Sequence, residues 1–426
     1  MSNSARSANY TLSIVIIGAL FFIFGFITWV NGTLIPYLKI ACELKSDFQA
    51  YLVATAFFIA YTVMAIPSSY VLRKTGYKRG MSLGLMIMAV GAIIFVPAAN
   101  TRNFDLFLVG LFIIGTGMAL LQTASNPYAT IIGPIESAAK RISILGICNK
   151  VAGILAGLIF GYIALNDADA LIANLQTMDA ATKEATLNEL AGRVIIPYII
   201  ISITLIILGV AILFSGLPDI DDNGGKDQGK SDSSNTAKTS VFQFPHLVFG
   251  VLAIFFYVGV EVLAGDTIIN YGKSLGIELS TARYFTQATL ACMLVGYIIG
   301  IFAIPKYISQ SNALKICSIL GVSFTVLAIV TEGYVSVGFI AALGLANSLM
   351  WPAIFPLAID GLGKFTKIGS ALLIMAIAGG AILPLIYGKL SDVRNTQQAY
   401  SIMVPCYLFI LFYAIKGHKA GKPSLV

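Results

Sequence analysis

The chain has 426 residues, of which 58% are hydrophobic and only 11% are charged. Because soluble domains carry about 25% charged residues, this composition excludes an ordinary soluble protein and makes lipid the solvent for most of the surface. The net charge of +7 therefore indicates basic loops at a membrane surface and not nucleic-acid binding.

Twelve segments of the chain are apolar and have roughly the 20-residue length that crosses a bilayer as a helix. The first half supplies six predicted spans: 12–36, 48–72, 80–99, 105–131, 142–165 and 194–215. The second half supplies six more: 244–270, 282–304, 313–331, 335–360, 368–389 and 397–416. The sequence thus predicts an all-α polytopic membrane protein with twelve transmembrane helices.

A polar segment, residues 216–241, separates the two groups of spans. It reads GLPDIDDNGGKDQGKSDSSNTAKTS over most of its length, which is rich in Gly, Ser and Asp and lacks apolar periodicity. Such a composition is typical of a flexible linker. We therefore predict an N-terminal six-helix bundle over residues 1–215, a cytoplasmic linker over 216–241 and a C-terminal six-helix bundle over 242–426.

The two halves of the chain resemble each other weakly. LLQTASNPYATIIGP in the first half spaces Gln122 and Pro127 as ANSLMWPAIFPLAIDG in the second half spaces Asn347 and Pro352. Two parallel repeats around an interior cavity are the plan of a two-bundle transporter. Chance similarity between apolar helices is the alternative.

The lysines and arginines indicate the orientation in the membrane. If the N-terminus is inside, the inside segments and adjoining span ends hold 17 of them and the outside ones hold 9, with Lys150 alone deep within a span. Because cytoplasmic loops are enriched in Lys and Arg, this distribution predicts that both termini are cytoplasmic. The short polar start, MSNSARSANYTLS, is interpreted as a tail and not as a cleaved signal peptide. We expect a multi-pass protein of the bacterial inner (plasma) membrane, monomeric in the lipid bilayer.

Polar side chains within membrane spans usually face a bundle interior or a water-filled cavity. Those of this chain are rich in amides, whose paired donors and acceptors suit a neutral polyhydroxyl ligand, and a Trp ring offers a flat apolar platform for a sugar. The alternative is that the amides only cross-link helices. The candidate substrate-binding residues are Asn31, Gln122, Asn126, Asn149, Gln287, Asn347 and Trp351.

Two acids in the predicted span 244–270, Glu261 and Asp266, are candidates for ion coupling. They are five residues apart, or roughly 140° around an ideal helix, so they share a face only where the helix unwinds. Glu261 is the first candidate for the coupling acid and Asp266 the second.

The third charged candidate is Lys150, which lies near the start of the apolar run ILGICNKVAGILAGLIFGYIA. It is near enough to the inner surface to snorkel, with its ammonium group reaching the interface. Its helical face carries Gly146, Gly153 and Gly157, however, which favours packing against protein. We therefore also consider an ion pair inside the cavity, with Glu261 as the named partner.

The sequence offers few residues for metal binding or catalysis. The five cysteines are scattered without a metal-binding spacing, and there are two histidines. We expect free thiols, no protein-bound metal and no organic cofactor, with Na⁺ near Asp266 or Glu261 as the candidate coupling ion. Because no nucleophile–base constellation or phosphate loop is present, we expect no catalysed reaction.

Several of these residues lie in motifs that resemble the fucose–proton symporter and glucose/galactose transporter family of the major facilitator superfamily. The motifs are NGTLIP, FLVGLFIIGTGMALLQTASNPYATIIGP, FYVGVEV, WPAIFPLAIDGLG and the LSD at 390–392, and the resemblance covers nearly the whole chain. The resemblance implies twelve helices in two bundles, alternating access and hexose uptake driven by H⁺ or Na⁺.

The chain departs from that family at the acids that carry the proton. The family's helix-1 pattern resembles NDILLP, and this chain has Gly32 in place of the Asp; the family's helix-4 Glu falls on Gln122. The family's helix-5 Asn matches Asn149, but Lys150 follows it here. The fucose symporter's proton route therefore does not transfer, and Na⁺ coupling, a relocated proton carrier and uncoupled facilitation all stay open.

We predict a secondary active transporter that imports a neutral hexose, glucose or galactose, by symport with Na⁺ or H⁺. Alternatives are a transporter of fucose or of an amino sugar such as N-acetylglucosamine, an uncoupled sugar facilitator, and a drug–proton antiporter of the same fold. A membrane sensor or scaffold is disfavoured because the predicted linker is too short for a folded output domain.

Overall fold

The computed structural model describes residues 3–131, 138–217, 239–304 and 306–421. In these ranges the chain forms helices and no β-strand. The first half contains α1 (Asn3–Trp29), α2 (Asn31–Ala41), α3 (Asp47–Asn100), α4 (Phe104–Ile131), α5 (Ala138–Leu165), α6 (Ala168–Leu175), α7 (Ala180–Gly192) and α8 (Ile195–Phe214). Most of the predicted linker, residues 216–241, lies outside the described residues.

The second half is divided into shorter pieces. It contains α9 (Pro245–Asp266), α10 (Ile268–Ser274), α11 (Leu279–Ala282), α12 (Phe285–Ala303), α13 (Gln310–Val330), α14 (Gly333–Asn347), α15 (Met350–Ile359), α16 (Thr366–Met375), α17 (Gly379–Val393), α18 (Thr396–Ala399) and α19 (Met403–Ile415). Eleven helical segments of the described chain are long and apolar enough to cross a membrane.

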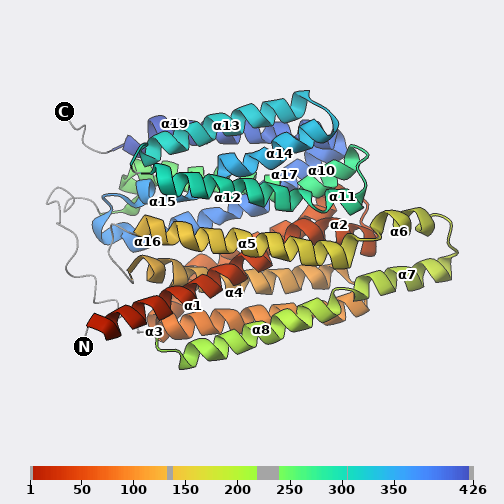
Figure 1. Cartoon of the computed structure of the whole chain (residues 1–426), viewed down its shortest axis with the longest axis horizontal. Helices are drawn as coiled ribbons and strands as arrows, with labels where there is room; N and C mark the ends of the chain where they lie inside the picture. The colour runs from red at the N-terminus through yellow and green to blue at the C-terminus, as the bar shows by residue number, and fades with distance from the viewer. Residues whose placement is uncertain (1–2, 132–137, 218–238, 305, 422–426) are drawn as a thin grey trace.

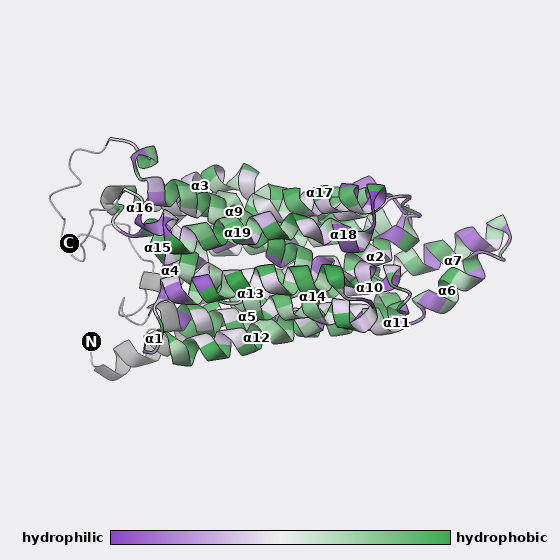
Figure 2. Cartoon of the chain, turned by 90° about the horizontal axis from the view of Figure 1, so that it is seen from above, coloured by the Kyte–Doolittle hydropathy of each residue, from purple (hydrophilic) through white to green (hydrophobic). Residues whose placement is uncertain are grey.

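The long helices lie side by side along one axis (Figure 1). The start of α1 and the end of α19 lie at the same end, which we call the terminal end. At the opposite end α6 and α7 project beyond the other helices as a hairpin, so we call it the hairpin end. Figure 2 shows hydrophobic residues along the middle of the helices and hydrophilic residues concentrated towards the two ends. The projecting hairpin was not predicted from the sequence.

Helix α3 holds two of the predicted spans, 48–72 and 80–99. At 54 residues it would be roughly 80 Å long if straight, more than twice the roughly 30 Å hydrocarbon core of a bilayer. Its backbone leaves the helical conformation at Gly76, where φ is 75° and ψ is 170°. This positive φ is readily adopted only by glycine. Gly76 therefore divides α3 into two arms, and each arm holds one predicted span.

The surface of the bundle has the polarity expected for contact with lipid. Helix α8 buries Ser202 and Gly209 against the other helices. Its opposite side is exposed and apolar, with Ile196 69% exposed and Ile207 61% exposed. Exposed apolar side chains are unfavourable in water. In the hydrocarbon of a bilayer they are favourable, because no apolar surface is exposed to water.

Two of the predicted spans are interrupted, one close to its end and the other near its centre. The predicted span 244–270 is divided at Thr267 between α9 and α10, where the Thr286 hydroxyl donates a 2.7 Å hydrogen bond to the Gly265 carbonyl. The predicted span 335–360 is divided between α14 and α15, just before Pro352. Proline has no N–H for the helix ladder, and a carbonyl that accepts a side-chain donor is less available to it.

The two halves of the chain meet along helices that run in opposite directions. Helix α5 of the first half contacts α12 of the second, and α3 contacts α17. A Cβ atom on Gly146 would lie 3.4 Å from the Tyr297 ring, and one on Gly157 only 1.8 Å from Gln287 Nε2. The predicted packing of this α5 face against protein is therefore confirmed.

A carboxylate of the second half holds the first half at the hairpin end. Asp392, in the last turn of α17, accepts hydrogen bonds from the backbone N–H groups of Asp47 (2.9 Å) and Phe48 (3.2 Å), the first residues of α3. The Ser391 hydroxyl donates a 2.6 Å bond to the Asp47 carboxylate, which also pairs with Lys39. Because the first N–H groups of a helix lack intrahelical partners, a carboxylate there is stabilising.

A second contact repeats this chemistry with the halves exchanged. Asp169 of α6 accepts 2.9 Å hydrogen bonds from the backbone N–H groups of Leu279 and Ser280, the first residues of α11. Asp169 follows the fifth predicted span and binds the chain at the start of the eighth. Asp392 follows the eleventh predicted span and binds the chain at the start of the second. This correspondence supports the weak internal repeat. We call these two contacts, Asp392 with α3 and Asp169 with α11, the hairpin-end gate.

Close packing of α1 against α5 provides a test of this arrangement. A Cβ atom on Gly25 would lie 1.8 Å from the Asn149 carbonyl oxygen, so Gly25→Ala is expected to lower the free energy of unfolding by roughly 1–3 kcal/mol. The matched control is Gly18→Ala on the same helix, where the added Cβ would lie 4.0 Å from Leu145. Thermal unfolding of the purified protein in detergent measures both, and equal melting temperatures would contradict the close contact.

Candidate functional site

An ion pair joins the two halves midway along the bundle. The Lys150 ammonium on α5 lies 2.9 Å from Glu261 Oε1 on α9, and the two side chains are 8% and 12% exposed. Lys150 therefore pairs with the partner predicted from the sequence and does not snorkel. Removing either partner would leave an isolated charge in an apolar interior, which is strongly unfavourable.

Trp29 provides the apolar wall of this pair. The Lys150 nitrogen lies 4.3 Å from the centre of a Trp29 ring, within the range of a cation–π contact. The ring fits between two glycines of different halves: a Cβ atom on Gly153 would lie 2.5 Å from the indole, and one on Gly265 2.3 Å. The indole N–H donates to Asn149 Oδ1 at 3.4 Å. Trp29 thus connects a predicted sugar contact with the ion pair.

Tyrosine hydroxyl groups surround Glu261 on the second-half side. Tyr257, one helical turn before Glu261, Tyr297 of α12 and Tyr407 of α19 all lie within electrostatic reach of its carboxylate. Tyr407 donates a 2.9 Å hydrogen bond to Asn347 Oδ1. The Lys150–Glu261 pair therefore has polar neighbours that include hydroxyl groups as well as amides.

The candidate residues on the terminal-end side of the ion pair are partly exposed. These are Gln122 and Asn126 on α4 and Trp351 on α15. Gln122 donates a 2.9 Å hydrogen bond to the Tyr61 hydroxyl. The Trp351 ring lies 6.4 Å from that of Tyr257. These side chains offer both hydrogen-bond donors and acceptors and an aromatic surface.

The candidate residues on the hairpin-end side are buried. Asn31 is 1% exposed and Gln287 is 6% exposed, and Asn347, near mid-depth, is 0% exposed. The Nδ2 group of Asn31 and both polar atoms of the Gln287 side chain have no hydrogen-bond partner in the described structure. Unpartnered buried polar atoms are uncommon and costly. With the hairpin-end gate closed, these residues are shielded from water.

Asp266 is the other predicted acid, and it differs sharply from Glu261. It is 2% exposed, and neither carboxylate oxygen has a hydrogen-bond partner in the described structure. It lies five residues beyond Glu261, roughly 7 Å further towards the hairpin end at helical rise. The two acids therefore have separate environments: Glu261 is neutralised by Lys150, whereas Asp266 has no such partner.

Apart from Trp351, sequence reasoning missed the aromatic part of this site. Trp29 and the tyrosines Tyr61, Tyr257 and Tyr407 were not among the predicted site residues. One signal was available, because Tyr257 precedes Glu261 by four residues and therefore shares its helical face. The other aromatic residues come from different helices and reach the site only through tertiary packing.

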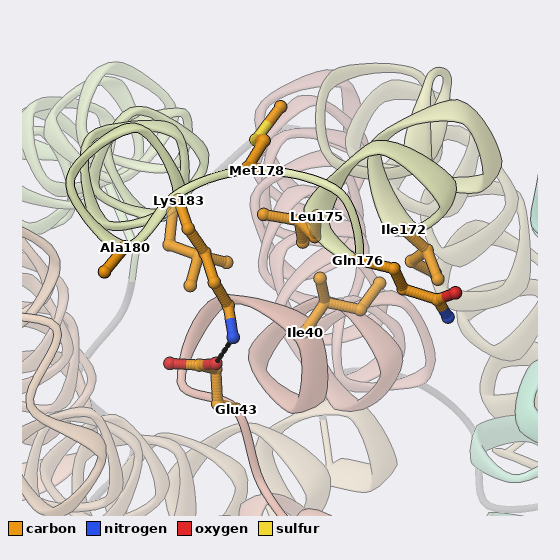
Figure 3. A pocket seen from close by; sticks show the side chains of 9 residues that line it. Ile40, Glu43, Ile172, Leu175, Gln176, Met178, Ala180 and Lys183 are labelled. Carbon is orange, nitrogen blue, oxygen red and sulfur yellow. Dashed lines mark ion pairs between the residues drawn. The ribbon is translucent and has the colours of Figure 1, made fainter.

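A separate pocket of about 630 Å³ lies at the hairpin end between α2, α6 and α7. Figure 3 shows Lys183 pointing to Glu43 there, and the two groups are 2.7 Å apart. The hydrogen bond and charge of Lys183 hold the pKa of Glu43 below its usual value. All the lining residues belong to the first half, so movement of one half against the other does not open or close this pocket.

The described residues contain no group of three or more His, Cys, Asp or Glu side chains arranged to hold a metal ion. The polar groups at the site are instead amides, hydroxyls, a single ion pair and a lone carboxylate. Such a set can hydrogen-bond a neutral polyhydroxyl molecule and can neutralise a monovalent cation.

The chain is similar to known membrane transporters over nearly its whole length. The family model of the Major Facilitator Superfamily matches residues 17–384. The glucose/galactose transporter of Brucella abortus is 33% identical over 422 residues, covering 98% of this chain and 97% of that protein. The L-fucose-proton symporter of Escherichia coli is 29% identical over 417 residues, covering 97% and 94%.

Solved structures resemble this one over a similar length. The transporter FucP in the outward conformation matches with a TM-score of 0.73 and 28% identity, covering 95% of this chain and 98% of that chain. A D-xylose-proton symporter matches with a TM-score of 0.67 and covers 97% and 99%. At 16% identity, the second likeness concerns the fold alone.

Proposed function

The chain belongs to the major facilitator superfamily, and we propose that it imports a neutral hexose, glucose or galactose, by symport with a monovalent cation. The observation that carries this proposal is the Lys150–Glu261 pair, which brings both halves together at mid-depth beside amide and aromatic side chains. A site made by both halves opens to one side and then the other as the halves move.

The proposed sugar site lies on the terminal-end side of the pair. Gln122, Asn126 and Asn149 come from the first half, and Asn347 and Trp351 come from the second. Amides match the alternating donors and acceptors of a sugar's hydroxyls, and Trp351 offers a face for its C–H groups. Asn31 and Gln287 are proposed to contact the sugar once the hairpin end opens.

The proposed coupling groups are Glu261, Asp266 and Lys150. One lysine neutralises one of the two acids, so transport can be linked to a cation that neutralises the other. The related fucose symporter is named for proton coupling, and Na⁺ is the second ion proposed. Uncoupled facilitation is the alternative, in which Lys150 permanently replaces the mobile cation.

The membrane arrangement is proposed on two grounds. Both ends of the described chain lie at the same end of the bundle, which requires an even number of crossings, and the break at Gly76 turns eleven candidate segments into twelve spans. The distribution of Lys and Arg supports a cytoplasmic terminal end and linker in the inner membrane. The two bundles then correspond to residues 1–215 and 242–426, and the transporter acts as a monomer.

The test of this proposal is uptake of labelled glucose into proteoliposomes, with Na⁺ and pH gradients imposed separately. Accumulation above the outside concentration under either gradient supports symport, and equilibration without accumulation under both gradients indicates a facilitator. Competition by unlabelled galactose, fucose and N-acetylglucosamine then ranks the substrates. No flux of any of these sugars would contradict the proposal.

Trp351→Ala is expected to raise the KM for glucose roughly tenfold, because loss of an aromatic face costs about 1 kcal/mol or somewhat more. Trp351→Phe is the matched control and should retain most of the affinity. Initial uptake rates over a range of glucose concentrations measure both. A KM unchanged in the alanine variant would exclude Trp351 from the sugar site.

A further inference from the structure

Asp266 is an isolated buried acid in the middle of the bundle. It is 2% exposed and neither oxygen has a hydrogen-bond partner among the described residues. Lys150 of α5 is already bonded to Glu261 at 2.9 Å. An ionised carboxylate in such a place is costly unless something neutralises it.

Among the described residues, Glu261 on the same helix and Tyr51 on α3 interact electrostatically with Asp266, and neither supplies a positive charge. A second acid opposes the ionised form of Asp266, and a tyrosine can only donate a hydrogen bond. A cation that arrives from outside the protein would supply the missing charge.

Stretches that adjoin Asp266 in space or in sequence carry other buried polar atoms without partners. A Cβ atom on Gly32 would lie 3.2 Å from the Gly265 carbonyl, so the start of α2 lies directly against the residue before Asp266. Thr33 Oγ1 in that stretch and Asn270 Nδ2, one turn after Asp266, have no hydrogen-bond partner in the described structure. Thr33 is 1% exposed and Asn270 is 8% exposed. The Thr33 oxygen can ligate a cation, whereas the Asn270 amide nitrogen can only donate a hydrogen bond.

We propose that Asp266 is the coupling carboxylate and binds the transported monovalent cation, with the Thr33 hydroxyl as a neighbouring oxygen donor. This inference rests on the proposed function and replaces Glu261 as the coupling acid. Glu261 remains bound to Lys150 as a neutral pair that joins the halves. Because Asp266 lies on the hairpin-end side of that pair, the cation enters when the hairpin-end gate opens.

Trp29 gives a direct signal for cation binding, because its ring packs against Gly265 beside Asp266. The chain has two tryptophans, so a Trp351→Phe background leaves Trp29 as the only one. Its fluorescence is titrated with NaCl, with choline chloride as the salt control, and separately with pH, in the absence of sugar. A saturable change under Na⁺ identifies Na⁺ as the cation, and a change under pH alone identifies H⁺. Asp266→Asn should remove whichever change is seen.

Transport separates this inference from the proposed function. Asp266→Asn is expected to keep exchange of labelled glucose at equal concentrations and to lose accumulation by at least tenfold. Asp105→Asn, at an exposed position on α4, is the control for loss of an acid and should accumulate normally. If Asp266→Asn fails to fold by size exclusion, Asp266→Glu is tested, with an expected tenfold or larger rise in the activating cation concentration.

Accumulation by Asp266→Asn at the wild-type level would overturn the inference while leaving the proposed function intact. A fluorescence response that Asp266→Asn leaves unchanged would also overturn it. Absence of sugar flux in the wild type would instead contradict the proposed function.

Discussion

Lys150→Ala is expected to abolish sugar accumulation and to lower the free energy of unfolding by about 3–5 kcal/mol. The change leaves Glu261, 12% exposed, as an unpaired charge in the interior, which is the costly way to break a buried ion pair. It also removes the cation that lies 4.3 Å from the Trp29 ring. Thermal unfolding in detergent and uptake into proteoliposomes measure the two effects.

The control for this prediction is a second lysine–glutamate pair in the same chain. Lys183 and Glu43 are 2.7 Å apart at the hairpin end, with side chains 40% and 48% exposed. Because exposed pairs contribute about 0–1 kcal/mol, Lys183→Ala should unfold almost like the wild type. Equal stability of the two alanine variants would contradict a buried pair at mid-depth.

The combined change Lys150→Met with Glu261→Gln tests the same pair without leaving a lone charge. A neutral pair of similar volume restores much of the stability that a single change removes. If Asp266 carries the coupling cation, the combined variant should still respond to the cation gradient. Loss of all cation dependence together with restored stability would assign coupling to the pair itself.

Asp169→Asn combined with Asp392→Asn is expected to open the hairpin end. Each carboxylate accepts two backbone N–H groups across the boundary between the halves. Loss of both charges should shift the open-to-closed ratio by roughly 30- to 150-fold, from a combined cost of about 2–3 kcal/mol. A shift of this size should change which side of the membrane the proposed sugar site faces.

A cysteine at position 33 reports this opening. Thr33 is 1% exposed, so Thr33→Cys in a version without the five native cysteines should react slowly with a membrane-impermeant maleimide. In the combined gate variant the reaction should become at least tenfold faster. Asp179→Asn is the matched control, since Asp179 also caps a helix start but only within the first half. Equal labelling rates in all three proteins would show that the gate carboxylates do not hold this end shut.

Part of the candidate site could be read from the sequence because charges within apolar runs are rare. Lys150, Glu261 and Asp266 were recognisable for that reason, and the glycines on the Lys150 face indicated protein packing. The different environments of the two acids could not be read in the same way. Glu261 and Asp266 are five residues apart on one helix, and only the approach of α5 gives one of them a partner.

The sequence by itself determined the class of protein and the approximate spans. In lipid every backbone polar group must be satisfied within its own helix, so long apolar runs have one stable structure and their ends are nearly fixed. The tertiary structure decided the breaks at Thr267 and before Pro352, the hairpin of α6 and α7, and the contacts across the halves. Lys150 meets Glu261 across 111 residues, and such a contact depends on which helices pack together, which local hydrophobicity does not encode.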